Sequence, residues 1–360
     1  MIVTAESKEE ALRQKLQGDI ISRKASTIKR APINWIWKNR LAKGKLTLLG
    51  GDPAMGKSQI ALDMIARITT GTAWCDGTGV APEGNCIILS AEDASDDTIC
   101  PRLDAAGAND DRVHIISAVR WNGHNRSFNL KEDLELLEQK IKEIGNVVLI
   151  MIDPITAYLG DQIDSHQTTA VRAILEPLAH FAEEQQIAIL GITHPPKAQQ
   201  QKAIQNFTGS FAFVAAARIA LLAIEDVEYP DDRKLLLGVK NNIGKLPDGI
   251  GYSIEEVTTK DGIETVHIEW DKEPVEVTAN EAIHAALASN NPSKIKIGEE
   301  FLTNYLRNKV SAPAKEILAE GVRQGISERT LKSAKKNAGI ISERMNGFAG
   351  DGTWIWRLRF

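Results

Sequence analysis

The sequence predicts an α/β fold with a mainly parallel central sheet, followed by a small C-terminal domain. Between residues 45 and 224, short apolar runs typical of buried strands alternate with segments of helical periodicity. The first of these runs leads directly into a glycine-rich loop that opens a helix. Residues 219–224 with 234–239, and 252–254 with 265–270, predict two hairpins at the end of this part.

The glycine-rich loop matches the pattern G-x-x-x-x-G-K-[ST] in full. Residues 45–50 predict a buried strand before it, and residues 59–68 place apolar side chains at helical spacing after it. The residues expected around the phosphates are Gly51, Asp52, Pro53, Ala54, Met55, Gly56, Lys57, Ser58 and Gln59. The strand, loop and helix predict a site for a nucleoside triphosphate. A plain glycine turn is the alternative.

The residue types of the loop suit phosphate chemistry. Gly51 and Gly56 allow a tight turn that directs backbone N–H groups and the helix N-terminus at phosphate oxygens. The Lys57 ammonium neutralises charge on the β- and γ-phosphates, and the Ser58 hydroxyl is a ligand for Mg²⁺. We therefore expect Mg²⁺ to accompany the nucleotide.

Polar side chains follow three further predicted strands. These side chains are Glu92 and Asp93 after residues 85–91, Asp153 after residues 147–152, and His194 after residues 187–193. Because the carboxyl ends of parallel strands meet at one edge of a sheet, we expect these side chains beside the phosphates. Asp153 would hold the water shell of Mg²⁺ opposite Ser58, and Glu92 would polarise the water that attacks the γ-phosphate.

These assignments have plainer alternatives. Glu92 and Asp93 would also suit the cap of a helix predicted at residues 97–106. His194 could sense the γ-phosphate, or it could be a histidine satisfied by backbone contacts. An apolar run that ends in an acid is common by chance, so Asp153 is informative because it lies about a hundred residues after a phosphate loop.

Together the motifs resemble those of RecA-like ATPases of the hexameric replicative helicase type, in particular the RepA-like group of plasmids and phages. The resemblance covers residues 32–270, and the order of the motifs is more specific than any one of them. Besides the loop and the strand ends, it includes Gly209-Ser210 with Arg218 eight residues further on, and Lys240-Asn241-Asn242-Ile243-Gly244.

The resemblance implies roles for six residues in ATP hydrolysis. They are Lys57 in the loop, Glu92 as catalytic base, Asp153 as Walker B acid, His194 as γ-phosphate sensor, and Arg218 and Lys240 as fingers that reach a neighbouring subunit's ATP. A cation supplied across an interface acts only when the subunits are correctly seated, so hydrolysis would depend on assembly. Asn242 departs from the Lys-x-Arg pair of the DnaB type, although it suits the RepA-like version. Arg218 in a surface salt bridge and Lys240 at an exposed strand end are the alternatives.

The resemblance also implies partners. It implies a hexameric homo-oligomer and DNA-contacting loops after the Walker B and sensor strands, here residues 160–169 and 195–208. Only the second loop is basic, with Lys197 and Lys202. Single-stranded DNA is therefore the expected partner of this part of the chain.

Residues 295–360 are similar to a winged helix. Residues 297–307, 312–321 and 328–337 predict three helices, with Ser327 as N-cap of the third, and residues 340–344 and 354–358 predict a hairpin. The third helix, which enters a major groove in that fold, carries Arg329, Lys332, Lys335 and Lys336, and Arg357 and Arg359 end the hairpin. Duplex DNA is an expected second partner, with a purely protein contact as the alternative.

Length and charge agree with this division. A chain of 360 residues exceeds the size at which one core usually suffices. We expect an N-terminal lead at 1–31, a RecA-like ATPase domain at 32–275, a linker at 276–294 and a winged-helix-like domain at 295–360. Although the net charge is −5, residues 1–44 hold ten basic against four acidic side chains, and residues 293–360 hold thirteen against seven. The basic ends are compatible with nucleic-acid contact.

The sequence predicts a cytoplasmic protein without a membrane partner, because it has no run of eighteen apolar residues and its start lacks the pattern of a signal peptide. Cys75, Cys86 and Cys100 lack metal-type spacing and suit reduced packing residues. The leading hypothesis is an ATP-hydrolysing, ring-forming, helicase-like motor on single-stranded DNA, used in replication of a plasmid, phage or prophage. A RecA-like loader or recombination ATPase and an ATP-gated DNA-binding regulator without unwinding activity are the alternatives.

Overall fold

The computed structural model describes residues 21–160, 167–195, 202–205, 207, 211–227, 229, 233–289, 292–345 and 353–358. The chain divides into two units, with the boundary between Ile33 and Asn34. In the first unit, residues 21–33 contain one 3-10 turn, Ala25–Thr27, and none of them is buried. The helix that the sequence suggests at residues 8–16 lies outside the described residues.

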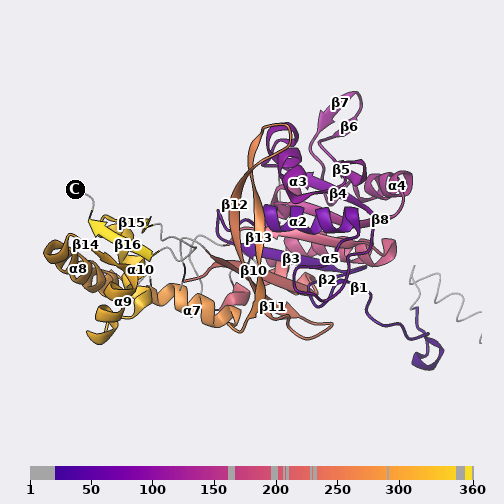
Figure 1. Ribbon diagram of the computed structural model, residues 1–360. Coiled ribbons are helices and arrows are strands. Elements are labelled where there is room, and N and C mark those ends of the chain that lie inside the picture. The colour runs from indigo at the N-terminus through magenta and orange to yellow at the C-terminus, as the bar shows by residue number, and fades with distance from the viewer. Residues whose placement is uncertain are drawn as a thin grey trace, which may run out of the picture. The chain divides into compact units, whose positions relative to one another are not determined.

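The second unit is organised around a nine-stranded sheet in the order β13-β12-β11-β10-β3-β9-β8-β4-β5 (Figure 1). Six neighbouring strands are parallel: β10 (Ile219–Glu225), β3 (Leu46–Gly51), β9 (Ala188–Thr193), β8 (Val147–Asp153), β4 (Asn85–Ser90) and β5 (Val113–Ile115). Three strands continue the sheet antiparallel: β11 (Lys234–Asn241), β12 (Gly249–Thr258) and β13 (Glu264–Val275). The mainly parallel central sheet and both hairpins are confirmed. Strands β12 and β13 are longer than predicted, because their ladder continues through polar residues that no apolar pattern marks.

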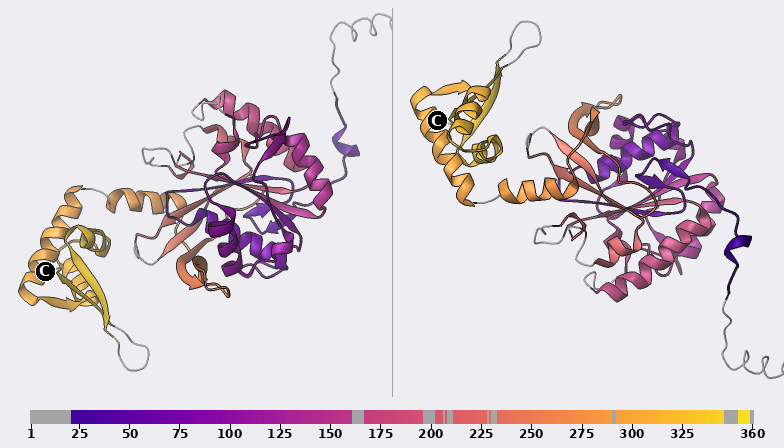
Figure 2. Two further views of the ribbon diagram at one scale, coloured as in Figure 1. Left: turned by 90° about the horizontal axis from the view of Figure 1, so that it is seen from above. Right: turned by 90° about the horizontal axis from the view of Figure 1, so that it is seen from below.

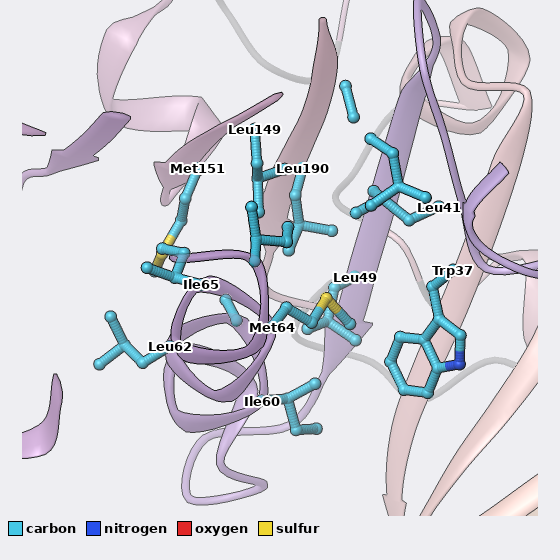
Figure 3. Packing of buried hydrophobic residues seen from close by; sticks show 14 of the residues in the cluster. Trp37, Leu41, Leu49, Ile60, Leu62, Met64, Ile65, Leu149, Met151 and Leu190 are labelled. Atoms are coloured by element: carbon cyan, nitrogen blue, oxygen red, sulfur yellow. The ribbon is translucent and has the colours of Figure 1, made fainter. Parts of the chain in front are cut away.

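Helices cover both faces of this sheet (Figure 2). One face carries α2 (Lys57–Thr70) and α3 (Cys100–Ala106), and the other carries α4 (Leu134–Ile144), α5 (Thr168–Gln185) and α6 (Phe211–Ala216). In the first core, apolar side chains of α2 pack with Leu49, Leu149 and Leu190 from the three strands beneath it (Figure 3). This packing fixes the start of α2 over the carboxyl end of β3, where the phosphate loop lies.

Trp37, which precedes the phosphate loop in the chain, belongs to this core. Strands β1 (Trp35–Trp37) and β2 (Leu41–Ala42) form a small antiparallel pair. The Trp37 ring is fully buried and stacks on the Trp74 ring with a centroid distance of 4.6 Å. A nucleobase therefore has no access to Trp37.

Several helix boundaries differ from the sequence expectation. The helix expected at residues 97–106 begins as a wider π turn, Ser95–Ile99, before α3. Residues 130–144 carry apolar side chains at helical spacing, which predicts a helix over that range. The chain becomes helical only at Leu134, because the Asn129 side chain accepts a hydrogen bond from the Lys131 N–H and holds a turn there. Helix α6 ends two residues before Arg218, and Gly209 and Ser210 lie outside the described residues.

The predicted linker, residues 276–294, is largely a docked helix. Helix α7 (Ala279–Ser289) packs Ala279, Ala282 and Ile283 against Leu222, Leu235 and Leu237 of β10 and β11. Small side chains let the helix approach the sheet closely, so this segment packs as part of the body that contains the central sheet.

The C-terminal residues have a core of their own. The element order is α8 (Pro292–Lys309), β14 (Ser311–Pro313), α9 (Ala314–Arg323), α10 (Glu328–Asn337), β15 (Ile340–Met345) and β16 (Thr353–Leu358). The three strands form a sheet in the order β14-β16-β15, and Leu302, Ile317, Leu331 and Trp356 are among the buried residues between sheet and helices. The Ser327 hydroxyl accepts a hydrogen bond from the Thr330 N–H at 3.2 Å, which is the predicted N-cap. Three helices and a hairpin are present, and β14 is additional. The assignment to winged helices stays a prediction.

No helix in the described ranges combines the length and the apolar character that a membrane crossing requires.

Candidate nucleotide site

The phosphate loop has a conformation that depends on its glycines. Gly51 has φ +152°, and a Cβ there would collide with the carbonyl oxygen of Ala223 in the neighbouring strand β10. Gly56, in the left-handed region with φ +70°, is the residue before the first turn of α2. The Lys57 ammonium donates a hydrogen bond to the Asp52 carbonyl at 2.8 Å, so the lysine folds over the loop. The loop is thus a closed turn at the start of α2, as its pattern predicts.

Strand β12, from the antiparallel part of the sheet, supports the loop. The Tyr252 hydroxyl donates a hydrogen bond to the Met55 carbonyl at 2.5 Å, and Ile254 lies against Gly56. Tyr252 is fully buried, and burial raises the pKa of its hydroxyl, which therefore stays a neutral donor. Sequence reasoning missed this support, because no local pattern connects residues 197 positions apart.

The structure joins Ser58 to the acid at the end of β8. The Ser58 hydroxyl donates a hydrogen bond to Asp153 Oδ2 at 2.5 Å. The Asp153 carboxyl is 5% exposed, and its burial raises its pKa, while the Ser58 hydrogen bond acts in the opposite direction. A hydroxyl and a carboxylate oxygen are the protein ligands that Mg²⁺ accepts when phosphates and water complete its shell. The pair fits a Mg²⁺ site.

The two acids that follow β4 have different surroundings. Asp93 forms an ion pair with Arg102 at 2.8 Å, and its N–H donates to the Ser90 hydroxyl. No side chain caps the helical turn that starts at Ser95, so the alternative that these acids are helix caps is wrong. The charges of Asp93 and then of Glu92 both add to the effect of burial in raising the pKa of Asp153, so both acids lie near the nucleotide side. They differ in that Asp93 is held by Arg102, whereas the Glu92 carboxylate is mostly exposed.

His194 stands next to Glu92 at the same edge. Its Nε2 lies 3.7 Å from Glu92 Oε2, so the two side chains are neighbours across the ends of β4 and β9. The structure thus brings together the phosphate loop, Glu92, Asp153 and His194, as predicted from the carboxyl ends of parallel strands.

The local electrostatics centre on Lys57, whose residue is 5% exposed. Burial lowers the pKa of its ammonium, and the opposing attraction comes from Asp153, Asp52 and Glu92. These three carboxylates outnumber the single ammonium, so the charge around Lys57 is net negative and favours an added cation. The site is electrostatically suited to phosphate groups that bring a divalent cation with them.

Arg218 and Lys240 lie at the opposite edge of the sheet. The Arg218 N–H donates to the carbonyl of Leu46, where β3 begins, whereas the phosphate loop follows the end of β3. A strand of this length spans roughly 20 Å. Arg218 is exposed and therefore does not belong to the nucleotide site of its own chain.

Lys240 is held within the chain. Its ammonium donates to the carbonyls of Val214 and Ala217 at 2.6 and 2.7 Å, which satisfies the C-terminal end of α6. Burial, and then the charge of Arg218, lower the pKa of this lysine. The lysine is half-buried and engaged, so neither an extended finger nor an exposed strand end describes this conformation.

The predicted DNA-contacting segments are described only in part. Residues 161–166 and 196–201, which include Lys197, lie outside the described residues, as do Arg359 and the turn of the C-terminal hairpin. Among the described basic residues of the C-terminal part, Lys335 lies over the Trp356 ring at 5.3 Å and Arg357 pairs with Glu343. These two side chains are thus engaged within the domain.

Comparison with known proteins places the chain in a family. The family model described as AAA domain matches residues 11–200, more than half of the chain. A solved ATPase domain of another protein is similar in structure, with TM-score 0.46, 11% identity, and 76% of this chain and 99% of that chain covered. A DnaB-like replicative helicase, studied with its interactions with primase, is similar with TM-score 0.46, 13% identity, and 70% of this chain and 64% of that chain covered. No curated protein matches the chain. With its phosphate loop in place and Asp153 bonded to Ser58, the chain belongs to the AAA domain family and is a P-loop ATPase.

Proposed function

We propose that this ATPase forms a ring, moves along single-stranded DNA and acts as a helicase in the replication of a plasmid, phage or prophage. The observation that carries the proposal is the position of Arg218. It is exposed at the sheet edge opposite its own phosphate loop, so it can complete only the site of another subunit. A ring gives every subunit such a neighbour.

In this proposal the residues at the carboxyl edge divide the chemistry. The loop N–H groups and Lys57 would bind the β- and γ-phosphates. Ser58 and Asp153 would hold Mg²⁺, which would neutralise charge on the phosphate oxygens. Glu92 orients the attacking water and accepts its proton at a carboxylate oxygen. His194 contacts the γ-phosphate, and a change at that phosphate is transmitted through His194 to the segment that follows β9.

Across the proposed interface, Arg218 stabilises the charge that develops on the transferred phosphoryl group. Lys240 has a supporting part, because its bonds to the end of α6 fix the backbone from which Arg218 extends. The single strand of DNA would contact residues 160–169 and the basic segment 195–208. In the C-terminal domain, α10 would contact duplex DNA.

A second candidate is an ATP-gated regulator that binds duplex DNA without unwinding it. It is favoured by the separate core of the C-terminal domain and by the net positive charge of residues 293–360. A loader or recombination ATPase would have the same nucleotide site as the helicase. It would differ from the helicase in that it does not unwind duplex DNA.

The test combines three measurements on the full chain. Native mass spectrometry with and without ATP and Mg²⁺ gives the assembly, ATPase assays with and without oligo(dT) give the coupling, and a forked duplex reports unwinding. A helicase assembles into a ring, is stimulated by the single strand and separates the fork. Stimulation without separation indicates a loader, and slow unstimulated turnover with selective duplex binding indicates the regulator. Lys57→Ala is the control that removes nucleotide binding, and unchanged hydrolysis in this variant would contradict all three.

A further inference from the structure

A small hairpin that the nucleotide site does not use projects from the body beyond β5 (Figure 1). Strands β6 (Val119–Trp121) and β7 (His124–Arg126) pair with each other and form a sheet of their own. The two turn residues, Asn122 and Gly123, both have positive φ, at 49° and 84°, which is the tight type I′ geometry. The hairpin follows the carboxyl end of β5 and so starts from the same sheet edge as the nucleotide site.

The base of the hairpin is firmly held. Arg126 donates two hydrogen bonds of 2.6 Å to the carboxylate of Asp133, whose side chain is 2% exposed. This pairing raises the pKa of Arg126 and keeps its guanidinium charged. Val119 and Phe128, on either side, are buried in the core under α4 and α5. The hairpin is therefore a rigid projection rather than a loose loop.

The tip of the hairpin presents an aromatic ring and positive charge. Trp121 is 57% exposed, and the fixed Arg126 guanidinium lies 5.9 Å from its ring centroid. Arg120 and His124 are also exposed. Residues 117–128 contain no acidic side chain, although the central part of the chain is strongly acidic overall.

The hairpin base also adjoins the start of a predicted DNA-contacting segment. The Leu130 N–H donates to the Tyr158 carbonyl at 2.8 Å, and the Phe128 and Tyr158 rings meet edge to face. A Cβ on Gly160 would come within 2.9 Å of the Asn129 side chain. The projection is thus attached to the chain just before residues 161–166.

We propose that this hairpin is a contact for single-stranded DNA, in which a base stacks on Trp121 and a phosphate pairs with Arg120. The inference rests on the proposed function and adds a binding element to it. Trp121 is an exposed ring braced by the Arg126 guanidinium, and Arg120 adds a second exposed cation on the other face of the same hairpin, with no acidic side chain in residues 117–128. A stacking surface with nearby positive charge is the combination that holds single strands. A protein partner at this hairpin would instead need acidic side chains opposite these cations.

The experiment measures binding of the full chain to fluorescent oligo(dT) by anisotropy, with a non-hydrolysable ATP analogue and Mg²⁺. Trp121→Ala is expected to raise the Kd about tenfold, and Trp121→Phe to recover most of the loss. Arg120→Ala is expected to weaken binding and to lower the slope of log Kd against log salt by about one. Lys43→Ala, an exposed cation before β3 at the opposite edge, is the matched charge control and should leave binding unchanged.

An abasic oligonucleotide of the same length isolates stacking. It should bind wild type less tightly than oligo(dT), whereas Trp121→Ala should bind both alike. Basal ATPase without DNA should be unchanged in every hairpin variant. Suppose that the wild type binds oligo(dT) and its ATPase is stimulated, and that Trp121→Ala binds oligo(dT) equally well. This result would overturn the inference about the hairpin and leave the proposed function standing. Wild type that neither binds nor is stimulated would overturn the proposed function and the inference with it. A Trp121→Ala variant with altered assembly and unaltered DNA affinity would assign the hairpin to a subunit contact and also overturn the inference.

Discussion

The Ser58 hydroxyl and the Asp153 carboxylate meet at 2.5 Å, although 95 residues separate them in the chain. Parallel pairing of β3, β9 and β8 brings the two positions together at one sheet edge. Burial raises the pKa of the Asp153 carboxyl, so its ionised form lowers the stability of the nucleotide-free fold. A bound divalent cation would offset this loss of stability by pairing with the carboxylate.

Asp153→Asn should separate these two effects. Without the carboxylate, we expect Mg²⁺-dependent hydrolysis to fall by at least about a hundredfold. Because the folded pKa of Asp153 is raised, this group makes the nucleotide-free protein more stable as pH falls, and its charged form is destabilising at neutral pH. The variant should therefore melt at a higher temperature than wild type at pH 7, and the difference should shrink toward pH 5. Melting curves of the two proteins check this, and a lower Tm for the variant at pH 7 would contradict it.

The neighbouring acids Glu92 and Asp93 should differ in their effect on turnover. Glu92→Gln removes the proposed base and should lower kcat by about 10² to 10⁴, with ATP binding retained. Asp93→Asn removes a partly exposed ion pair with Arg102 and should leave kcat within a few fold. Steady-state kinetics and nucleotide titrations distinguish the two variants. Equal losses of kcat would remove the assignment of Glu92.

Tyr252→Phe tests the support of the phosphate loop. It leaves the Met55 carbonyl without its donor, so the free energy of unfolding should fall by about 1–3 kcal/mol and the KM for ATP should rise. Tyr305→Phe, which removes an exposed hydroxyl in the C-terminal part, is the matched control and should change stability by less than about 0.5 kcal/mol. Denaturant titrations measure both. An unchanged KM would mean that β12 stabilises the fold without shaping the loop.

Arg218→Ala should suppress turnover and preserve nucleotide binding, because in the proposed ring its guanidinium acts on a neighbour's nucleotide. Mixed with Lys57→Ala subunits, which keep Arg218 and lack binding, the variant should regain part of its activity. ATPase rates across mixing ratios provide the measurement. If no ratio restores activity, the residue acts in its own chain or only in folding.

Much of the site could be predicted from the sequence, because its residues stand at the ends of strands and in one continuous loop. The phosphate loop, Asp153 and the strand pairs follow from short patterns and from the rule that parallel strands end at one edge. The position of Arg218 at the other edge also follows, since it precedes β10.

What the sequence could not show depends on contacts between distant segments. The bond from Tyr252 to Met55 and the bonds from Lys240 to the end of α6 have no local signature. The hairpin β6–β7 has strands of three residues rich in polar side chains, so no apolar alternation marks it. Helix α7 falls within the predicted linker because its apolar face is made mainly of alanine, which gives only a weak hydrophobic pattern.

Strand β10 connects the phosphate loop with Arg218. At its carboxyl end, Ala223 presses on Gly51 so closely that no side chain fits between them, and its amino end continues directly from Arg218. A strand hydrogen-bonded on both sides is stiff along its axis. In a ring, a small shift of Gly51 on product release would therefore be delivered to Arg218 as a movement of the whole strand. The nucleotide state of one subunit would then control the hydrolysis rate in its neighbour. Sequential hydrolysis around the ring would need no coupling element other than this strand.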